Sequence, residues 1–360
     1  MLGGMTTTYD VSVIGGGVAG LSGALVLARS RRSVLVIDSG EPRNAPAAGV
    51  HNYLGHDGIN PLALLELGRA EVRGYGAHVV EGRVATAVRD GDGFSVRLAD
   101  GRSFTARRLL VTTGLVDELP DVPGVRERWG RDVLHCPYCH GWEVRDQAIG
   151  VLATRPAAAH MALLFRQLSP DVVLFAHTAP PLTTEEREQL AARDIRIVQG
   201  EVVALDIVQD RLSGVRLADG TVVPRQAVVV TPRFVARSDV LASLGLHPTP
   251  HPMGFGEHIV ADATGKTSAA GVWVAGNVGD LSAGVMVAAG SGVAAAAAIN
   301  ADLVAEDTRR ARLPSLTSHP ATPREGVTGT VIGGAAEASP RRSSASAAPS
   351  SASTPPLRLR

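Results

Sequence analysis

The sequence contains two cysteines, Cys136 and Cys139, within the segment LHCPYCHGWE. A histidine flanks the pair on each side, His135 before it and His140 after it. Residues of these types could bind a zinc ion, attach a c-type haem through the C-x-x-C-H pattern, or exchange electrons as a redox-active dithiol. An inert buried pair is a fourth interpretation.

A redox-active dithiol without a metal is the interpretation that we favour. A structural zinc ion normally takes four ligands, and the sequence has no second C-x-x-C. Haem attachment requires export, for which the N-terminal segment MLGGMTTTYDVSVIGGG lacks a basic region, an apolar run and a cleavage site. We therefore expect a cytoplasmic protein, in which a close cysteine pair is more often catalytic or metal-binding than a structural crosslink.

A glycine-rich loop near the N-terminus predicts a dinucleotide site. Residues 10–16 predict a buried strand and residues 19–30 a helix, and the glycines between them have the G-x-G-x-x-G spacing. In this context Gly15 permits a tight turn, Gly17 lets a pyrophosphate approach the backbone, and Gly20 allows close packing of helix on strand. The phosphates then lie at the helix N-terminus, where free amide groups favour negative charge.

Later residues indicate which dinucleotide binds. Asp38 ends the next predicted strand about 20 residues further on, where an acidic side chain accepts a hydrogen bond from a ribose hydroxyl. We expect FAD rather than NAD, because two distant segments fit a flavoenzyme. These are VTTG at residues 111–114, which ends with Gly114, and GVWVAGNVGDLSAGV at residues 271–285.

The strand–helix pattern begins a second time at residues 148–153. A later segment, GVRLADGTVVPRQAVVVTP, is similar to the earlier SVRLADGRSFTARRLLVTTG, which suggests a duplicated domain plan. The sequence therefore predicts an α/β fold with two Rossmann-like dinucleotide-binding domains of three layers (ββα). From residue 308 to residue 360 the composition shifts to Ser, Ala, Pro, Thr and Arg, which predicts a disordered tail.

Together these motifs resemble the low-molecular-weight thioredoxin reductase family of FAD-dependent disulfide oxidoreductases. The resemblance implies a discontinuous FAD-binding domain, residues 8–120 and 246–305. An inserted NAD(P)-binding-like domain, residues 121–245, then carries the cysteine pair. It also implies that Gly276 and Asn277 lie against the flavin phosphate or ribityl chain, with Asn277 where family members usually have Asp. Family members are usually homodimers, so a homodimer is expected.

By the same resemblance, Cys139 is the sulfur next to the flavin and Cys136 the sulfur that exchanges with the substrate. Many family members have Asp after the second cysteine as the proton carrier. His140 stands there, and an imidazole can accept and return a proton near neutral pH. His135 could serve the other sulfur. The pattern HCPYCHG looks like that of the dithiol oxidases, which close thiol pairs in products such as gliotoxin and holomycin.

NADPH binding is doubtful in this sequence. Ala153 and Arg155 stand where the second domain should have its first two glycines, and bulk at the second position blocks a pyrophosphate. The next strand region, VVLFAHTAPP, lacks the arginine pair that grips a 2′-phosphate in family members. We therefore expect oxidation of a small-molecule dithiol with O2 as acceptor. The alternatives are NADPH-dependent reduction of a thioredoxin-like protein and a flavin-binding redox sensor.

Composition gives no sign of a nucleic-acid or membrane partner. The chain of 360 residues is 45% hydrophobic and 19% charged, and its formal net charge is zero, so no global field attracts a polyanion. Its apolar segments are short or interrupted. His51 and Asn52, in the segment GVHNYLGHDG, stand where family members approach the flavin, and a solvated loop is the alternative.

Overall fold

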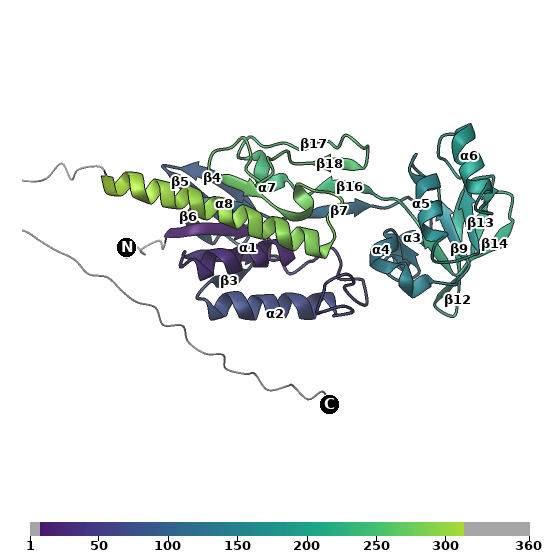
Figure 1. Ribbon diagram of the computed structural model, residues 1–360, viewed down its shortest axis with the longest axis horizontal. Helices are drawn as coiled ribbons and strands as arrows, with labels where there is room; N and C mark the ends of the chain where they lie inside the picture. Colours follow the sequence, from purple (N-terminus) through teal and green to yellow (C-terminus); the bar gives the residue numbers. More distant parts are fainter. Residues whose placement is uncertain (1–7, 313–360) are drawn as a thin grey trace, which may run out of the picture. The chain divides into compact units, whose positions relative to one another are not determined.

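The computed structural model of the chain describes residues 8–312. Most of the predicted tail, and residues 1–7, lie outside the described residues. Figure 1 shows two mainly parallel sheets with helices packed on them, joined by a pair of long connections. The predicted α/β fold class is confirmed by this architecture.

The first sheet combines the N-terminal strand–helix unit with strands from much later in the chain. Its order is β3-β2-β1-β6-β5-β4, and β19 also pairs with β6. Strands β3, β2, β1, β6 and β19 are parallel, whereas β4 and β5 are antiparallel. The strands are β1 (Thr8–Ile14), β2 (Val34–Asp38), β3 (His78–Glu81), β4 (Val84–Asp90), β5 (Gly93–Leu98), β6 (Ser103–Val111) and β19 (Val272–Val274). Parallel pairing brings the segments that follow β1, β6 and β19 to the same edge of the sheet.

Helices cover one face of this sheet, and a shorter layer covers the other. The first face packs against α1 (Val18–Arg29), α2 (Pro61–Gly74) and α8 (Val285–Arg312), around completely buried side chains such as Leu27, Val36 and Ile299. The opposite face packs against α7 (Asp239–Ala242) and neighbouring segments. Burial of aliphatic side chains on both faces explains why the parallel strands read as continuous apolar runs.

The second sheet has the order β11-β10-β9-β15-β8, and all its pairings are parallel. One face packs against α5 and α6, and the other against the antiparallel sheet β12-β13-β14. The strands are β8 (Val133–Leu134), β9 (Ile149–Leu152), β10 (Val172–Phe175), β11 (Arg196–Val198), β12 (Val202–Val208), β13 (Arg211–Leu217), β14 (Val222–Pro224) and β15 (Ala227–Val229). The helices are α3 (Val125–Arg128), α5 (Ala158–Phe165) and α6 (Thr184–Ala191). This is the three-layer plan that the sequence predicts.

Two antiparallel strands carry the chain between the sheets. They are β7 (Leu115–Glu118) and β16 (Arg233–Ala236), and β16 extends the pairing to β18 (Gly256–His258) and β17 (Thr249–Pro250). The side chains of Val240 and Leu241 already lie in the core of the first sheet. The chain therefore reaches the core of the first sheet at α7, before the predicted boundary at residue 245. The extents of the folding domains stay a prediction.

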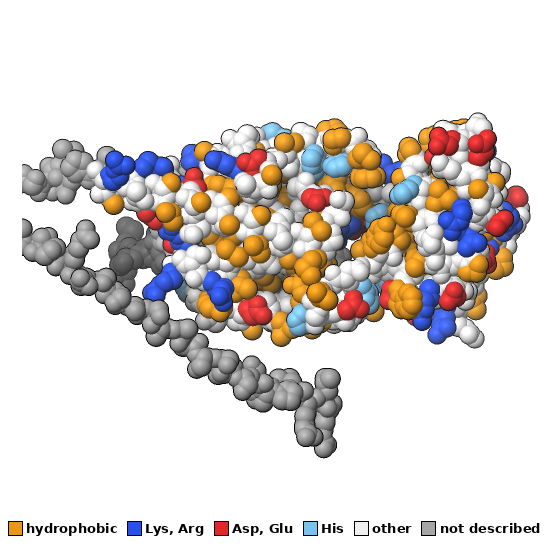
Figure 2. Space-filling view, in the orientation of Figure 1, with side chains coloured by type: hydrophobic (Ala, Val, Ile, Leu, Met, Phe, Trp, Pro, Cys, Tyr) orange, Lys and Arg blue, Asp and Glu red, His pale blue; other side chains and the backbone are white. Residues whose placement is uncertain are grey.

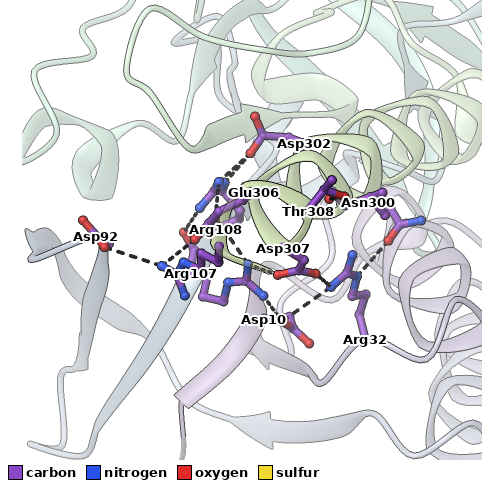
Figure 3. Close-up of polar contacts among 12 residues, drawn as sticks. Asp10, Arg32, Asp92, Arg107, Arg108, Asn300, Asp302, Glu306, Asp307 and Thr308 are labelled. Atoms are coloured by element: carbon purple, nitrogen blue, oxygen red, sulfur yellow. Dashed lines mark hydrogen bonds and ion pairs between the residues drawn. The ribbon is translucent and has the colours of Figure 1, made fainter. Parts of the chain in front are cut away.

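An ion-pair network fixes the C-terminal half of α8 to the first sheet (Figure 3). Arg108 on β6 contacts Glu306 at 2.6 Å and Asp302 at 2.7 Å, and Arg107 contacts Asp307 at 2.5 Å. The helix continues to Arg312, so the prediction that disorder starts at residue 308 is wrong for the first residues of that segment. Composition alone did not reveal these contacts, because their arginines lie about 200 residues earlier in the chain.

The outer face of α8 is apolar. By length and composition alone the helix could cross a membrane, but its inner side chains Ile299 and Leu303 are completely buried, as in the core helix of a globular domain. Its exposed apolar side chains are Met286, Val287, Val293 and Val304. Figure 2 shows hydrophobic side chains along this helix and basic ones near its C-terminal end.

Candidate active site

One pocket of about 1050 Å³ brings the predicted cofactor loop and the cysteine pair together. It opens at the carboxyl edge of the first sheet and extends to the segment that follows β8. Most of the predicted site residues line it: Gly15, Gly17, Asp38, Gly114, His135, Cys136, Cys139, His140, Gly276 and Asn277. Gly20 does not line the pocket. His51 and Asn52 also line the pocket.

The three glycines of the loop have the geometry that a pyrophosphate cradle requires. Gly15 has φ +109°, and a Cβ there would lie 2.5 Å from the carbonyl oxygen of Thr112. A Cβ at Gly17, the N-cap of α1, would meet no atom within 4 Å, so the space beside it is open. A Cβ at Gly20 would lie 2.0 Å from the carbonyl oxygen of Gly15, so Gly20 serves packing and not ligand contact. The loop therefore fits a dinucleotide.

Asp38 ends β2 beside the glycine loop. Its Oδ1 accepts a hydrogen bond from the amide of Gly16 at 3.0 Å, and its Oδ2 lies 3.2 Å from Nη2 of Arg69. The side chain is 16% exposed and lines the pocket. These two contacts orient the carboxylate, and its remaining lone pairs can accept a hydrogen bond from a ribose hydroxyl. Arg69 is a contact that the sequence did not indicate.

The segment after β19 forms the opposite side of the cradle. Gly276, with φ +71°, begins the short helix η2 (Gly276–Val278) and donates its amide to the hydroxyl of Ser291 at 2.9 Å. A Cβ at Gly276 would lie 2.9 Å from that of Ala19 on α1. Gly114, with φ +71°, ends the segment after β6 and lies in open space. These backbone conformations favour glycine and leave room at the pocket wall.

Asn277 uses its amide to hold the pocket wall. Its Nδ2 donates to the carbonyl oxygen of Asp280 at 3.0 Å and to that of Ala283 at 2.9 Å. An ionised aspartate at this position could only accept hydrogen bonds. In this chain the amide therefore closes the loop 277–283 from within, a role that a carboxylate could not take.

We expect Asn277→Asp to lower the free energy of unfolding by about 2 kcal/mol, because a carboxylate would face two carbonyl oxygens. The measurement is thermal unfolding of the variant and wild type. Asn300→Asp is the matched control, since Asn300 accepts a hydrogen bond from Arg32 through Oδ1, an atom that aspartate retains. Equal stability of N277D and N300D would contradict this assignment.

The cysteine pair begins the short helix α4 (Pro137–His140), with Cys136 at its N-cap. Both thiols are free, and the two Sγ atoms lie 2.6 Å apart. The hydrogen bond from the Cys139 thiol, with further help from the amide of Cys139, lowers the pKa of Cys136 to about 7. The same shared proton and burial raise the pKa of Cys139. The lowered pKa favours a thiolate at Cys136, the form that attacks sulfur.

Both flanking histidines are neutral at physiological pH. Burial lowers the pKa of His135, whose Nδ1 lies 3.2 Å from the carbonyl oxygen of Val230. A carbonyl oxygen can only accept, so Nδ1 carries the hydrogen and Nε2 has the free lone pair. Burial also lowers the pKa of His140, against a smaller opposite effect of Glu143. Each imidazole can therefore act as a proton acceptor.

His51 and Asn52 connect the loop after β2 to the cysteine helix. Nε2 of His51 lies 3.4 Å from Oε1 of Glu143, in the helix η1 (Trp142–Val144) that follows α4. Asn52, with φ +60°, donates from Nδ2 to the carbonyl oxygen of Tyr138 at 2.5 Å. The segment is more than a solvated loop, because it holds the cysteine helix at the pocket.

Sequence reasoning missed an arginine in this pocket. Arg43 makes a bidentate contact with Asp117 on β7, at 2.7 and 2.6 Å. Its guanidinium lies 5.1 Å from the ring centroid of Phe234 on β16. Only the unusual segment EPRN after the second strand could have drawn attention to it, since Arg43 and its partners are far apart in the sequence.

The loop after β9 lacks the glycine spacing that forms the dinucleotide cradle in the loop after β1. Ala153 is buried and its amide bonds the carbonyl oxygen of Phe175 on β10, at 2.9 Å. Helix α5 starts with Ala157 at its N-cap, without a side-chain cap. Arg155 precedes it, and a side chain of that size stands where a dinucleotide loop has glycine.

Comparison with known proteins agrees with this geometry. Residues 9–298 match the family model described as pyridine nucleotide-disulphide oxidoreductase. The thioredoxin reductase tcpT of Claviceps purpurea is 32% identical over 311 residues, 82% of this chain and 95% of that protein. The crystal structure of HlmI is similar with a TM-score of 0.80 at 51% identity, and the match covers 86% of this chain and 97% of that one. An oxidoreductase from Agrobacterium tumefaciens gives 0.78 at 35% identity, over 83% and 99% of the two chains.

Proposed function

Because the chain belongs to the pyridine nucleotide-disulphide oxidoreductase family, we propose that it oxidises a small-molecule dithiol to a disulfide with O2 as the acceptor. The overall reaction converts one dithiol and one O2 into one disulfide and one H2O2, so two electrons and two protons leave the substrate. The family and the relatives named thioredoxin reductase establish the coarser activity, FAD-dependent thiol–disulfide chemistry. Direction, acceptor and substrate are the proposal.

The observation that carries the direction is the contrast between the two nucleotide loops. The loop after β1 has three glycines with cradle geometry, whereas the loop after β9 has Ala153 and Arg155 at the corresponding first two positions. A protein that cannot hold NADPH cannot draw electrons from it. Electrons must then enter from the thiol substrate and leave to an acceptor that needs no binding loop, such as O2.

FAD fits the first loop, with Gly15, Gly17, Asp38, Gly114, Gly276 and Asn277 around it. When bound, it supplies two-electron redox chemistry between the dithiol and an external acceptor. The protein's own residues carry out the thiol exchange in the same pocket.

In the proposed exchange, a substrate thiolate attacks Sγ of Cys136 in the oxidised Cys136–Cys139 pair. The S–S bond of the pair breaks, and Cys139 leaves as a thiolate. The second substrate thiol then attacks the substrate sulfur of the mixed disulfide, which releases Cys136 as a thiolate and the product as a disulfide. His140, with His135, accepts the two substrate protons, because both are neutral imidazoles that line the same pocket as the cysteines.

The second candidate is an NADPH-dependent reductase of a thioredoxin-like protein. The names of the relatives favour it, since several of them are thioredoxin reductases. The two candidates differ in which reagent reduces the protein.

An anaerobic titration of the FAD-loaded protein separates them. We expect dithiothreitol to bleach the flavin band at about 450 nm within seconds, and NADPH to leave it unchanged, because only the dithiol has a route to the cofactor. Admission of air should restore the band with one H2O2 for each dithiol consumed. Rapid bleaching by NADPH, or no O2 uptake with a dithiol, would contradict the oxidase and support the reductase.

Assembly and location also remain proposals. A homodimer would cover the exposed apolar face of α8 defined by Met286, Val287, Val293 and Val304. A reducing compartment such as the cytoplasm suits a protein whose two cysteines cycle between thiol and disulfide.

A further inference from the structure

A partly buried ion pair lines the same pocket as the cysteine pair and takes no part in the exchange described above. The Asp117 side chain is 8% exposed, and its two oxygens contact Nε and Nη2 of Arg43 at 2.7 and 2.6 Å. Arg43 belongs to the loop after β2, and Asp117 to β7, which carries the chain toward the second sheet. Two parallel charge-assisted hydrogen bonds fix the plane and position of the guanidinium.

The guanidinium is also held from a second side. It lies 5.1 Å from the ring centroid of Phe234, and that ring packs edge-on against His135 at 5.2 Å between centroids. His135 directly precedes Cys136, and Arg43, Asp117, Phe234 and both cysteines line the same pocket. The array Asp117–Arg43–Phe234–His135 therefore connects a fixed positive charge to the segment that carries the reactive sulfur.

We propose that Arg43 is a positioning residue of the thiol chemistry, whose fixed positive charge stabilises the thiolate of Cys136 within the pocket. This inference deepens the proposed function and rests on the Cys136–Cys139 pair being the site of exchange. The carboxylate of Asp117 and the ring of Phe234 hold the charge in place, so that no reorganisation is needed when the thiolate forms.

The other charges around the sulfurs support this assignment. His135 and His140 are neutral because burial lowers the pKa of each, so neither supplies a positive charge. The negative groups are Glu143 after α4, near His140, and Asp117, which is paired with the Arg43 guanidinium and also acts on His135. His51 is shared between Asp57 and Glu143. The thiol and amide of Cys139 are larger causes of the lowered pKa of Cys136, and the charge of Arg43 acts in the same direction. At Cys139 the charge of Arg43 only opposes the larger effects that raise the pKa of that thiol.

The test is the alkylation rate of Cys136 in the FAD-loaded protein, fully reduced with dithionite under nitrogen. Iodoacetamide labelling is followed by mass spectrometry of the Cys136 peptide from about pH 5 to pH 9, because only the thiolate reacts. In the wild type we expect the rate to rise with pH and to be half-maximal near the Cys136 pKa of about 7. Arg43→Gln should lower the rate at pH 7 by about threefold and move the midpoint to higher pH.

Three further variants separate charge from local structure. Arg43→Lys keeps the charge but loses the bidentate contact with Asp117, so its rate at pH 7 should fall less than that of R43Q. Asp117→Asn removes the opposing carboxylate, so its rate at pH 7 should equal or exceed that of the wild type. Arg233→Gln is the matched control, since Arg233 lies on β16 next to Phe234 but pairs with Glu118 and Glu257 away from the pocket. It should leave the rate unchanged.

An unchanged rate and midpoint in R43Q would overturn the inference, as would an equal fall in R43Q and R43K. A fall in both R43Q and D117N would also overturn it, because damage to local structure lowers both, whereas a charge effect has opposite signs. The proposed function is tested separately by dithiol-dependent O2 uptake of the wild type, which does not depend on how the thiolate is stabilised. Failure of the inference about Arg43 is therefore distinguishable from failure of the proposed function.

Discussion

Replacing Cys136 with serine should reduce dithiol-dependent O2 uptake by at least about a thousandfold, because a serine hydroxyl can neither form the disulfide nor leave as a thiolate. Cys139→Ser should have the same effect, since each sulfur needs the other to close the pair. The measurement is O2 consumption with dithiothreitol in an electrode cell, corrected for the rate with free FAD. Both variants should retain bound flavin, because the glycine cradle lies on a different element from the cysteines.

Flavin content and thermal unfolding of each serine variant serve as controls for folding. Cys136 and Cys139 are not fully buried, so the loss of one sulfur atom should leave the unfolding temperature nearly unchanged. Appreciable turnover by the double variant C136S/C139S would mean that the substrate reaches the flavin directly. The exchange mechanism proposed for this pocket would then be wrong.

Gly17→Val should give a folded protein that is almost free of flavin, with affinity for FAD lowered at least about a hundredfold. The reason is local: a Cβ at Gly17 meets no protein atom within 4 Å, so the valine side chain would occupy the open space meant for the pyrophosphate. The backbone there has φ −72°, which valine adopts without strain. The measurement is the flavin absorbance of the purified protein and its FAD dissociation constant.

Gly74→Ala is the matched control, because that glycine ends α2 and a Cβ there also meets open space, but outside the pocket. It should bind FAD like the wild type. If G17V were yellow and fully loaded, the pyrophosphate would have to lie elsewhere, and the loop after β1 would not be its cradle. Gly20→Ala would be a poorer test, since its Cβ would strike the Gly15 carbonyl oxygen and disturb the fold itself.

The sequence by itself determined the chemistry-bearing groups and the fold class. Cys136 and Cys139 with their two histidines, and Gly15, Gly17 and Gly20 between a strand and a helix, are short-range patterns. The chemistry of these patterns follows from the local geometry of a turn and a helix N-terminus, and the spacing of the residues determines that geometry. The apolar runs of the strands likewise follow from burial on both faces of a parallel sheet.

Only the tertiary structure decided which groups meet. It brought Gly276 and Asn277 to the loop of Gly15 through the pairing of β19 with β6, and it turned the Asn277 amide inward to two carbonyl oxygens. It also joined Arg43 to Asp117, residues separated by 74 positions, and continued α8 past the predicted start of the tail. Contacts of this kind depend on side-chain direction and on loop closure over long stretches of chain, and neither leaves a periodic or compositional signal in one sequence.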